Sequence, residues 1–186
     1  MKKRLFVAIN LPPEIKGQIH REIESIKSYW PAKYPIRFTA IENLHITLIF
    51  LGNQEEKFLE PIKKAIEEVA PSFFQPEIQL NRLIYGPEGK FKRMIWLNGE
   101  SNSLALIRKE LEKNLISNQI DFKKENRDFS LHVTLARFNF NPEPSVPLPQ
   151  KIDFSFKPKT IDLMESRVKS DGPIYSIVKT LNFKEG

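Results

Sequence analysis

The sequence has 186 residues, 40% of them hydrophobic, no cysteine and a formal net charge of +6. This length is enough for one large domain or two small lobes, and the missing cysteines exclude disulfides, thiolate catalysis and cysteine-rich zinc sites. No apolar run approaches the roughly 20 residues of a membrane span, and the basic start leads into a short strand, so we expect a cytoplasmic protein. The positive charge favours a polyanionic partner, nucleic acid before membrane, although a lysine-rich solvated surface explains it equally well.

The first half of the chain alternates strands and helices. Pro12 and Pro13 open a helix with isoleucines at helical spacing, and Pro71 ends a second helix. His20 lies on the first helix among charged neighbours, which is typical of a surface residue. The predicted elements are a strand at 5–9, a helix at 13–29, a strand at 44–52, a helix at 58–69 and strands at 78–85 and 93–97.

The second half contains one helix and several strands. The helix begins near Ser101 or Ser103, and a polar loop at 117–128 follows it. Residues 139–150 carry four prolines and predict an extended surface connection. A turn at 171–173 separates the last two strands. The predicted strands lie at 131–135, 152–156, 159–166 and 174–183.

Two strands carry the same polar pattern. Residues 44–48 read LHITL and residues 131–135 read LHVTL, and these copies hold two of the three histidines. Because side chains alternate along a strand, His45 and Thr47 point to one face and the aliphatic residues to the other. His132 and Thr134 repeat this arrangement. Each strand can therefore bury one face and present a histidine and a hydroxyl on the other.

The two histidines are 87 positions apart, and the same offset carries the first helix onto the third. Strand, helix, long loop and histidine strand thus recur in one order, which predicts a single bilobal domain over 1–186 with a repeat at roughly 4–52 and 92–138. Two similar lobes related by a pseudo-twofold axis would set the histidine faces opposite each other across a cleft.

A pair of histidines in one cleft can hold one neutral ring as a general base and one protonated ring as a general acid. Threonine hydroxyls can bind anionic oxygens, so the set suits in-line displacement at phosphorus. One His-x-Thr unit alone is more often structural, but two copies inside a repeat favour catalysis. A metal site is disfavoured because the sequence has no close-spaced His or Cys cluster.

At these residues the chain resembles the two-histidine phosphoesterase family, in its branch of RNA 2′,3′-cyclic phosphodiesterases or 2′-5′ RNA ligases. Five segments carry the resemblance in the family's order: RLFVAINLPPEIK, ENLHITLIFLG, FKRMIWLNG, FSLHVTLARF and ESRVKSDGPIYSIV. Two positions depart from the pattern. Ile49 stands where many relatives carry a basic residue, and Leu131 stands where many carry proline.

The resemblance implies an α+β fold of two lobes, with antiparallel sheets facing a central cleft and helices outside. It also implies hydrolysis of an RNA-terminal 2′,3′-cyclic phosphate to a 2′-phosphate, with no metal or other cofactor, and reverse 2′-5′ ligation. Carried over by motif, His45 is the general acid, His132 is the general base, and Thr47 and Thr134 hold the phosphate oxygens. The implied partners are RNA ends, tRNA-like or oligonucleotide, or nucleoside 2′,3′-cyclic phosphates, and we expect a monomer.

Three further residues are weaker candidates. Arg137 could neutralise phosphate charge, yet strict alternation puts it opposite His132 unless the strand bulges. Phe6 and Tyr175 are candidates for stacking on a terminal base, with core packing as the more common role of such residues. Two alternative functions stay open: a non-catalytic basic RNA-binding module, and the same site acting on another small cyclic phosphate or a 2′-5′ oligonucleotide.

Overall fold

A computed structural model gives the fold, and it describes residues 2–87, 89, 91–125, 128–139, 146–149, 152–169 and 172–185. Strands and helices follow one another as the sequence predicts, with an additional short strand, β2. The helices are α1 (Pro13–Tyr29), α2 (Leu59–Val69) and α3 (Leu104–Ser117). The strands are β1 (Lys2–Asn10), β2 (Ile36–Phe38), β3 (His45–Glu55), β4 (Ile78–Gly86), β5 (Met94–Ser101), β6 (His132–Phe138), β7 (Phe154–Phe156), β8 (Thr160–Lys169) and β9 (Gly172–Asn182).

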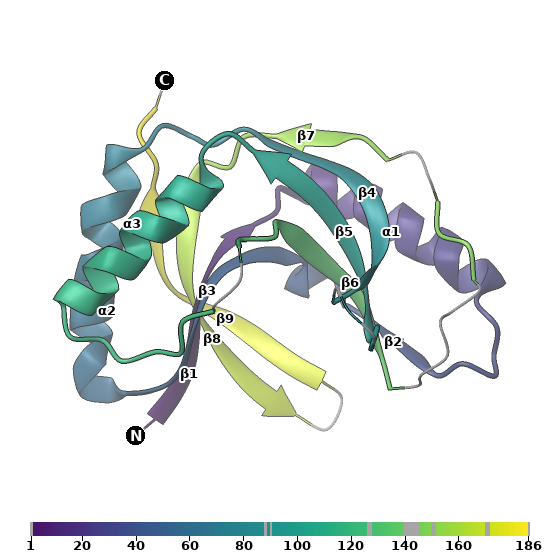
Figure 1. Ribbon diagram of the computed structural model, residues 1–186, viewed down its shortest axis with the longest axis horizontal. Coiled ribbons are helices and arrows are strands. Elements are labelled where there is room, and N and C mark those ends of the chain that lie inside the picture. Colours follow the sequence, from purple (N-terminus) through teal and green to yellow (C-terminus); the bar gives the residue numbers. More distant parts are fainter. Residues whose placement is uncertain are drawn as a thin grey trace.

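The strands form one curled antiparallel sheet in the order β7-β4-β5-β6-β3-β1-β8-β9, with β2 on β6 (Figure 1). The two halves of this order have equivalent strands. From the centre outward, one half has the histidine strand β3, then β1, which begins its repeat, and then β8 and β9; the other half has the histidine strand β6, then β5, which begins its repeat, and then β4 and β7. At the centre β3 pairs with β6 through Ile46 and Val133, the residues between the histidine and the threonine of each motif. The pseudo-twofold axis of the α+β fold therefore passes between the two motifs.

The helices lie on the outer face of the curled sheet (Figure 1). The helix of each repeat covers the half of the sheet that belongs to the other repeat. α1 follows β1 but contacts β7, at the end of the half that contains β5 and β6. α3 follows β5 but packs on α2 and touches β3. Isoleucines and leucines at helical spacing on α1, α2 and α3 meet the outer aliphatic side chains of the sheet in one core. The inner face carries polar side chains together with aromatic ones, among them Phe50, Trp96 and a small cluster around Phe6.

Several details differ from the sequence-based expectation. β2 lies between the expected helix at 13–29 and the expected strand at 44–52, where no strand was predicted, because three residues after Pro35 find backbone partners on β6. The last strand already begins at Gly172, inside the expected turn, and Asp171 lies outside the described residues. Most of the proline-rich segment, 140–145 and 150, also lies outside them. His20 is exposed, as expected. None of the described helices is both long enough and apolar enough to cross a membrane.

Candidate active site

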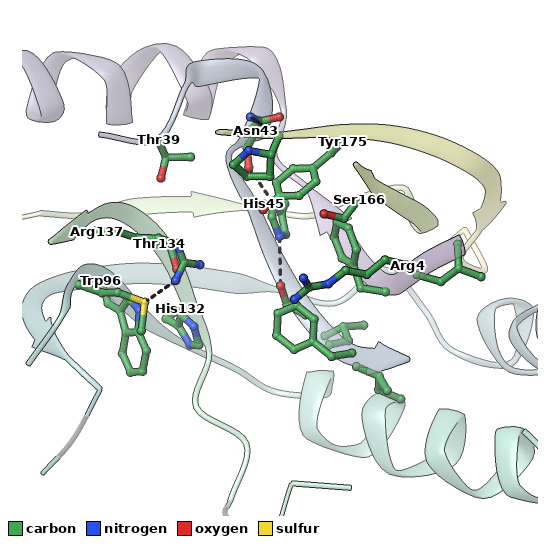
Figure 2. Close-up of a pocket in the computed structure, with 18 of the residues that line it drawn as sticks. Arg4, Thr39, Asn43, His45, Trp96, His132, Thr134, Arg137, Ser166 and Tyr175 are labelled. Atoms are coloured by element: carbon green, nitrogen blue, oxygen red, sulfur yellow. Dashed lines mark hydrogen bonds between the residues drawn. The ribbon is translucent and has the colours of Figure 1, made fainter. Parts of the chain in front are cut away.

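Both His-x-Thr units line one cavity of about 550 Å³ on the inner face of the sheet. Leu44, Ile46 and Leu48 are buried on the outer face, and their counterparts on β6 are buried in the same way. The alternation of strand side chains therefore turns His45, Thr47, His132 and Thr134 inward, where all four are half-buried. Figure 2 shows the two imidazoles on opposite sides of the cavity.

The two imidazoles are held in the same way. Nδ1 of His45 lies 2.6 Å from the carbonyl oxygen of Asn43, and Nδ1 of His132 lies 2.7 Å from the carbonyl oxygen of Ser130. Because a carbonyl oxygen only accepts hydrogen bonds, each Nδ1 carries the proton and donates it. In each neutral ring Nε2 is then the basic nitrogen, which is the atom that a proton-transfer role requires.

His45 is buried strongly enough to change its titration. Burial lowers the pKa of its imidazole from 6.5 to about 4, and the positive charges of Lys16 and Arg137 lower it further. The Nδ1 hydrogen bond to Asn43 acts in the opposite direction and raises the pKa. The ring is therefore neutral at pH 7, and its Nε2 lies 3.1 Å from Oγ1 of Thr47. In this state the threonine hydroxyl donates and the imidazole accepts.

Aromatic rings surround His45. Phe6 and Tyr175 each place a ring centroid 5.1 Å from the imidazole, Tyr175 edge-on. Phe6 is only 2% exposed and also contacts Phe50 and Tyr175, so its position supports the packing role that we weighed against base stacking. Tyr175 is half-buried at the wall of the cavity, where base stacking stays a prediction.

His132 has a different neighbour. Its ring stacks on the indole of Trp96 with centroids 4.0 Å apart and planes 22° from parallel. Trp96 is 3% exposed, and its indole N–H makes no hydrogen bond to any other described residue. The ring fits because Gly86 has no side chain: a Cβ there would lie 2.4 Å from a Trp96 ring carbon. The indole is thus held between the Gly86 backbone and the imidazole.

A β-bulge brings Arg137 to the site. On β6 the register against β5 skips Leu135, since Trp96 pairs with Thr134 and Ile95 with Ala136. The extra residue reverses the alternation, so Arg137 faces the cavity with His132 instead of the outer side. Its Nη1 lies 3.0 Å from Sδ of Met94. Strict alternation would have placed Arg137 opposite His132, and the structure contains the bulge that reverses this.

Several residues of the cavity were not predicted from the sequence, among them Arg4 and Phe50. Arg4 extends from β1 toward the imidazole of His45 (Figure 2). Phe50 lines the cavity with 52% of its surface exposed. The repeat would have identified Phe50, because it is the position that matches Arg137 when the two motifs are aligned.

The unusual residues of the two motifs are buried, although Ile49 also borders the cavity. Ile49 and Leu131 are each 5% exposed, and both belong to the hydrophobic core. Instead, Arg4, Arg37 and Arg137 supply positive charge along the cavity wall. The described ranges hold no group of three or more His, Asp or Glu side chains arranged to bind a metal ion. The donor set is thus suited to an anion with oxygens at its periphery.

Comparison with known proteins agrees with this architecture. The family model of the 2′-5′ RNA ligase superfamily matches residues 12–169. An RNA 2′,3′-cyclic phosphodiesterase of Methanocaldococcus jannaschii is 32% identical, over 95% of this chain and 98% of the relative. The crystal structure of TT0787 of Thermus thermophilus superposes with a TM-score of 0.83 at 23% identity, over 98% of each chain.

Apo LigT of Escherichia coli superposes with a TM-score of 0.72 at 25% identity, again over 98% of each chain. The family model and the archaeal relative both extend over most of the chain, well beyond the two short motifs. The chain therefore belongs to the 2′-5′ RNA ligase superfamily, and its resemblance to the two-histidine phosphoesterases is confirmed.

Proposed function

We propose that this protein is an RNA 2′,3′-cyclic phosphodiesterase in which His45 and His132 form the acid–base pair and no metal takes part. The observation that carries the proposal is the identical anchoring of the two imidazoles in one cavity. Each Nδ1–H is fixed on the carbonyl oxygen two residues earlier, and each ring has a threonine beside it on the same strand face. The relatives named as RNA 2′,3′-cyclic phosphodiesterases support the reaction class.

Hydrolysis needs one proton removed and one supplied. A water molecule attacks phosphorus, the base takes its proton, the new P–O bond forms, and the bond from phosphorus to the 3′ oxygen breaks as the acid protonates that oxygen. The product is a 2′-phosphate. Thr47 and Thr134 would donate hydrogen bonds to the non-bridging oxygens, and Arg137 would offset their negative charge.

We assign the acid to His45 and the base to His132. His45 is neutral in the free protein, since burial lowers its pKa to about 4. Bound phosphate would place negative charge beside the ring and favour the protonated form, which raises the pKa. This assignment therefore requires that His45 takes up a proton when the substrate binds.

Ligation uses the same chemistry, with the 5′ hydroxyl of a second RNA end in place of water. The reverse of ligation is cleavage of the 2′-5′ linkage, and in that direction the two histidines exchange roles. The cavity is open enough to hold groups on both sides of the phosphate, at about 550 Å³. We therefore propose 2′-5′ ligation as a secondary activity on RNA ends. A purely RNA-binding role is less well supported, because binding a backbone requires lysine and arginine and not paired, anchored histidines.

The test is hydrolysis of the four nucleoside 2′,3′-cyclic phosphates in the presence of EDTA. We expect turnover that EDTA does not reduce, a 2′-phosphate product, and a loss of at least about a thousandfold in kcat/KM for His45→Ala and for His132→Ala. His20→Ala is the matched control, because that exposed histidine is outside the cavity.

Full activity in either cavity variant would refute the histidine pair. A 3′-phosphate product would refute the assigned leaving group. Salt-sensitive RNA binding that survives in both variants, with no turnover by the unmodified protein, would support the RNA-binding alternative instead.

A further inference from the structure

The neighbouring strands β1 and β8 separate before they end. Their pairing stops at Leu5 and Glu165. Beyond this point, residues 2–4 remain paired with β3, and residues 166–168 remain paired with β9. The sheet therefore opens into a fork between the N-terminal end of β1 and the β8–β9 hairpin, which diverge in Figure 1.

The fork contains a second hollow, of about 610 Å³, next to the histidine cavity. Residues 2–4 line one side of this hollow, and residues 165–168 line the other. Arg4, Ser166 and Val168 line both the hollow and the histidine cavity. The fork is therefore a side opening of the cavity, through which a chain longer than one nucleotide can leave it.

An ion-pair cluster lies on the outer face of the fork. Nζ of Lys3 is 3.8 Å from one carboxylate oxygen of Glu165, and Nε of Arg167 is 2.8 Å from the other. Glu165 is only 8% exposed, so the two cations share one nearly buried carboxylate. This cluster links the two arms of the fork where they separate.

The inner face of the fork carries cations that are not paired in this way. Side chains alternate along β1, so Lys2 lies on the same face as Arg4, which lines the cavity. Both are exposed, and neither forms an ion pair with a residue that the structure describes. Glu55 lies opposite Lys2 on β3 but is paired with Lys57 at 3.0 Å. These two cations are therefore available to an anionic ligand.

The spacing of the two cations matches an RNA backbone. Lys2 and Arg4 are two residues apart, about 7 Å on an extended strand, which is close to the separation of neighbouring phosphates in an extended single strand. Proteins commonly bind single strands by a positively charged groove that follows the backbone. An extended peptide could pair with the open strand edges, but it would not require a row of cations.

We propose that the fork binds the RNA chain that precedes the reacting end. With the cyclic phosphate at the histidines, the chain leaves the cavity past Ser166, and its next two phosphates lie against Arg4 and then Lys2. This inference rests on the proposed function, because it assumes that the RNA end is bound between the histidines. It adds a preference for oligonucleotides over mononucleotides that does not depend on sequence, since the contacts are to phosphates.

The experiment compares a tetranucleotide that ends in a 2′,3′-cyclic phosphate with the nucleoside 2′,3′-cyclic phosphate of the same terminal base. The measured quantity is the ratio of kcat/KM for the tetranucleotide to kcat/KM for the mononucleotide. Two phosphate contacts predict that this ratio falls about sevenfold between about 50 and about 200 mM salt, and Lys2→Gln, which keeps one contact, should reduce the fall to about threefold. Lys2→Arg should retain the full salt dependence.

Lys109→Gln is the matched control, because this exposed lysine of α3 lines neither hollow; its ratio should depend on salt as in the unmodified protein. Equal kcat/KM for the two substrates in the unmodified protein would overturn the inference. An unchanged salt dependence of the ratio in Lys2→Gln would do the same, as would an equal loss on both substrates.

If the unmodified protein hydrolyses neither substrate, the proposed function fails, and the inference is then decided by binding. The probe is a tetranucleotide with a 2′-phosphate end and a fluorescent label at its 5′ end, and its anisotropy is measured over the same salt range. A weaker salt dependence of binding in Lys2→Gln supports the fork as an RNA site, and equal salt dependence in both proteins refutes it.

Discussion

At the scale of single residues, the two histidines share their anchoring and differ in their surroundings. Both donate Nδ1–H to a carbonyl oxygen, but His45 is enclosed by Phe6 and Tyr175, whereas His132 is stacked on Trp96. A symmetric repeat has thus produced two environments for the same side chain. Acid–base catalysis requires such a difference, because one ring must hold a proton while the other does not.

The pKa of His45 is the first prediction at this scale. In an NMR titration of the free protein, the His45 imidazole should titrate near pH 4, because burial disfavours its charged form. Nucleoside 2′-monophosphate should raise this pKa by adding negative charge beside the ring.

The proton uptake on binding should follow the same titration. Above about pH 4 the His45 imidazole of the free protein is neutral, so binding of a phosphate that protonates it takes up a proton, and this uptake, measured by calorimetry in buffers of different ionisation enthalpy, should disappear below about pH 4. The exposed His20 provides the reference signal in the NMR spectra. A His45 pKa near 6.5, unchanged by the nucleotide, would contradict this account.

At the scale of elements, β-bulges and one glycine determine what faces the cavity. The bulge at Leu135 turns Arg137 inward, and the missing side chain of Gly86 on β4 leaves room for the indole of β5 under His132. Neither feature lies in the His-x-Thr motifs. The position of His132 therefore depends on β4 and β5, two strands that carry neither motif.

Gly86→Ala tests this dependence. The new Cβ would lie 2.4 Å from the Trp96 ring, so the indole must move, and overpacking should cost about 1–3 kcal/mol of unfolding free energy. Displacement of the ring beneath His132 should also lower kcat by at least about tenfold. Urea unfolding and steady-state kinetics measure the two effects.

Gly17→Ala is the matched control. No atom lies within 4 Å of a Cβ at Gly17, which is in α1, so alanine should raise the unfolding free energy by about 0.5–1 kcal/mol through helix propensity. If Gly86→Ala keeps the stability and the kcat of the unmodified protein, the position of Trp96 does not depend on its close contact with the Gly86 backbone.

At the scale of the whole molecule, the two lobes are not independent. One sheet runs through both by the β3–β6 pair, where Ile46 and Val133 are fully buried. The helix α1 leaves the half that contains β1 and packs on the other half, where Trp30 contacts Phe138 of β6. Separating the lobes would expose α1, α3 and the centre of the sheet.

We therefore expect cooperative unfolding. Urea transitions followed by tryptophan fluorescence, which reports Trp30 and Trp96 in one half, should coincide with those followed by far-UV circular dichroism, which reports both halves. Val133→Ala should lower the common midpoint by removing buried methyl groups at the centre, a cost of about 1–3 kcal/mol. Two separate transitions would mean that the lobes unfold independently.

The sequence by itself determined most of the elements and the strand face on which both His-x-Thr units lie. Hydrophobic periodicity is a local property, so the helices and the inward direction of His45, Thr47, His132 and Thr134 could be predicted from residue spacing alone. The 87-residue repeat also predicted the opposed lobes, because two copies of one unit pack most simply about a twofold axis.

Only the tertiary structure decided which other side chains reach the cavity. Arg137 and Phe50 each depend on a bulge, Trp96 on the absence of a Cβ in a neighbouring strand, and Arg4 on the place of β1 beside β3. These features arise from register and close packing between strands distant in sequence, which a local pattern does not encode. The same packing separated Phe6, enclosed beneath the site, from Phe50, which faces the solvent of the cavity.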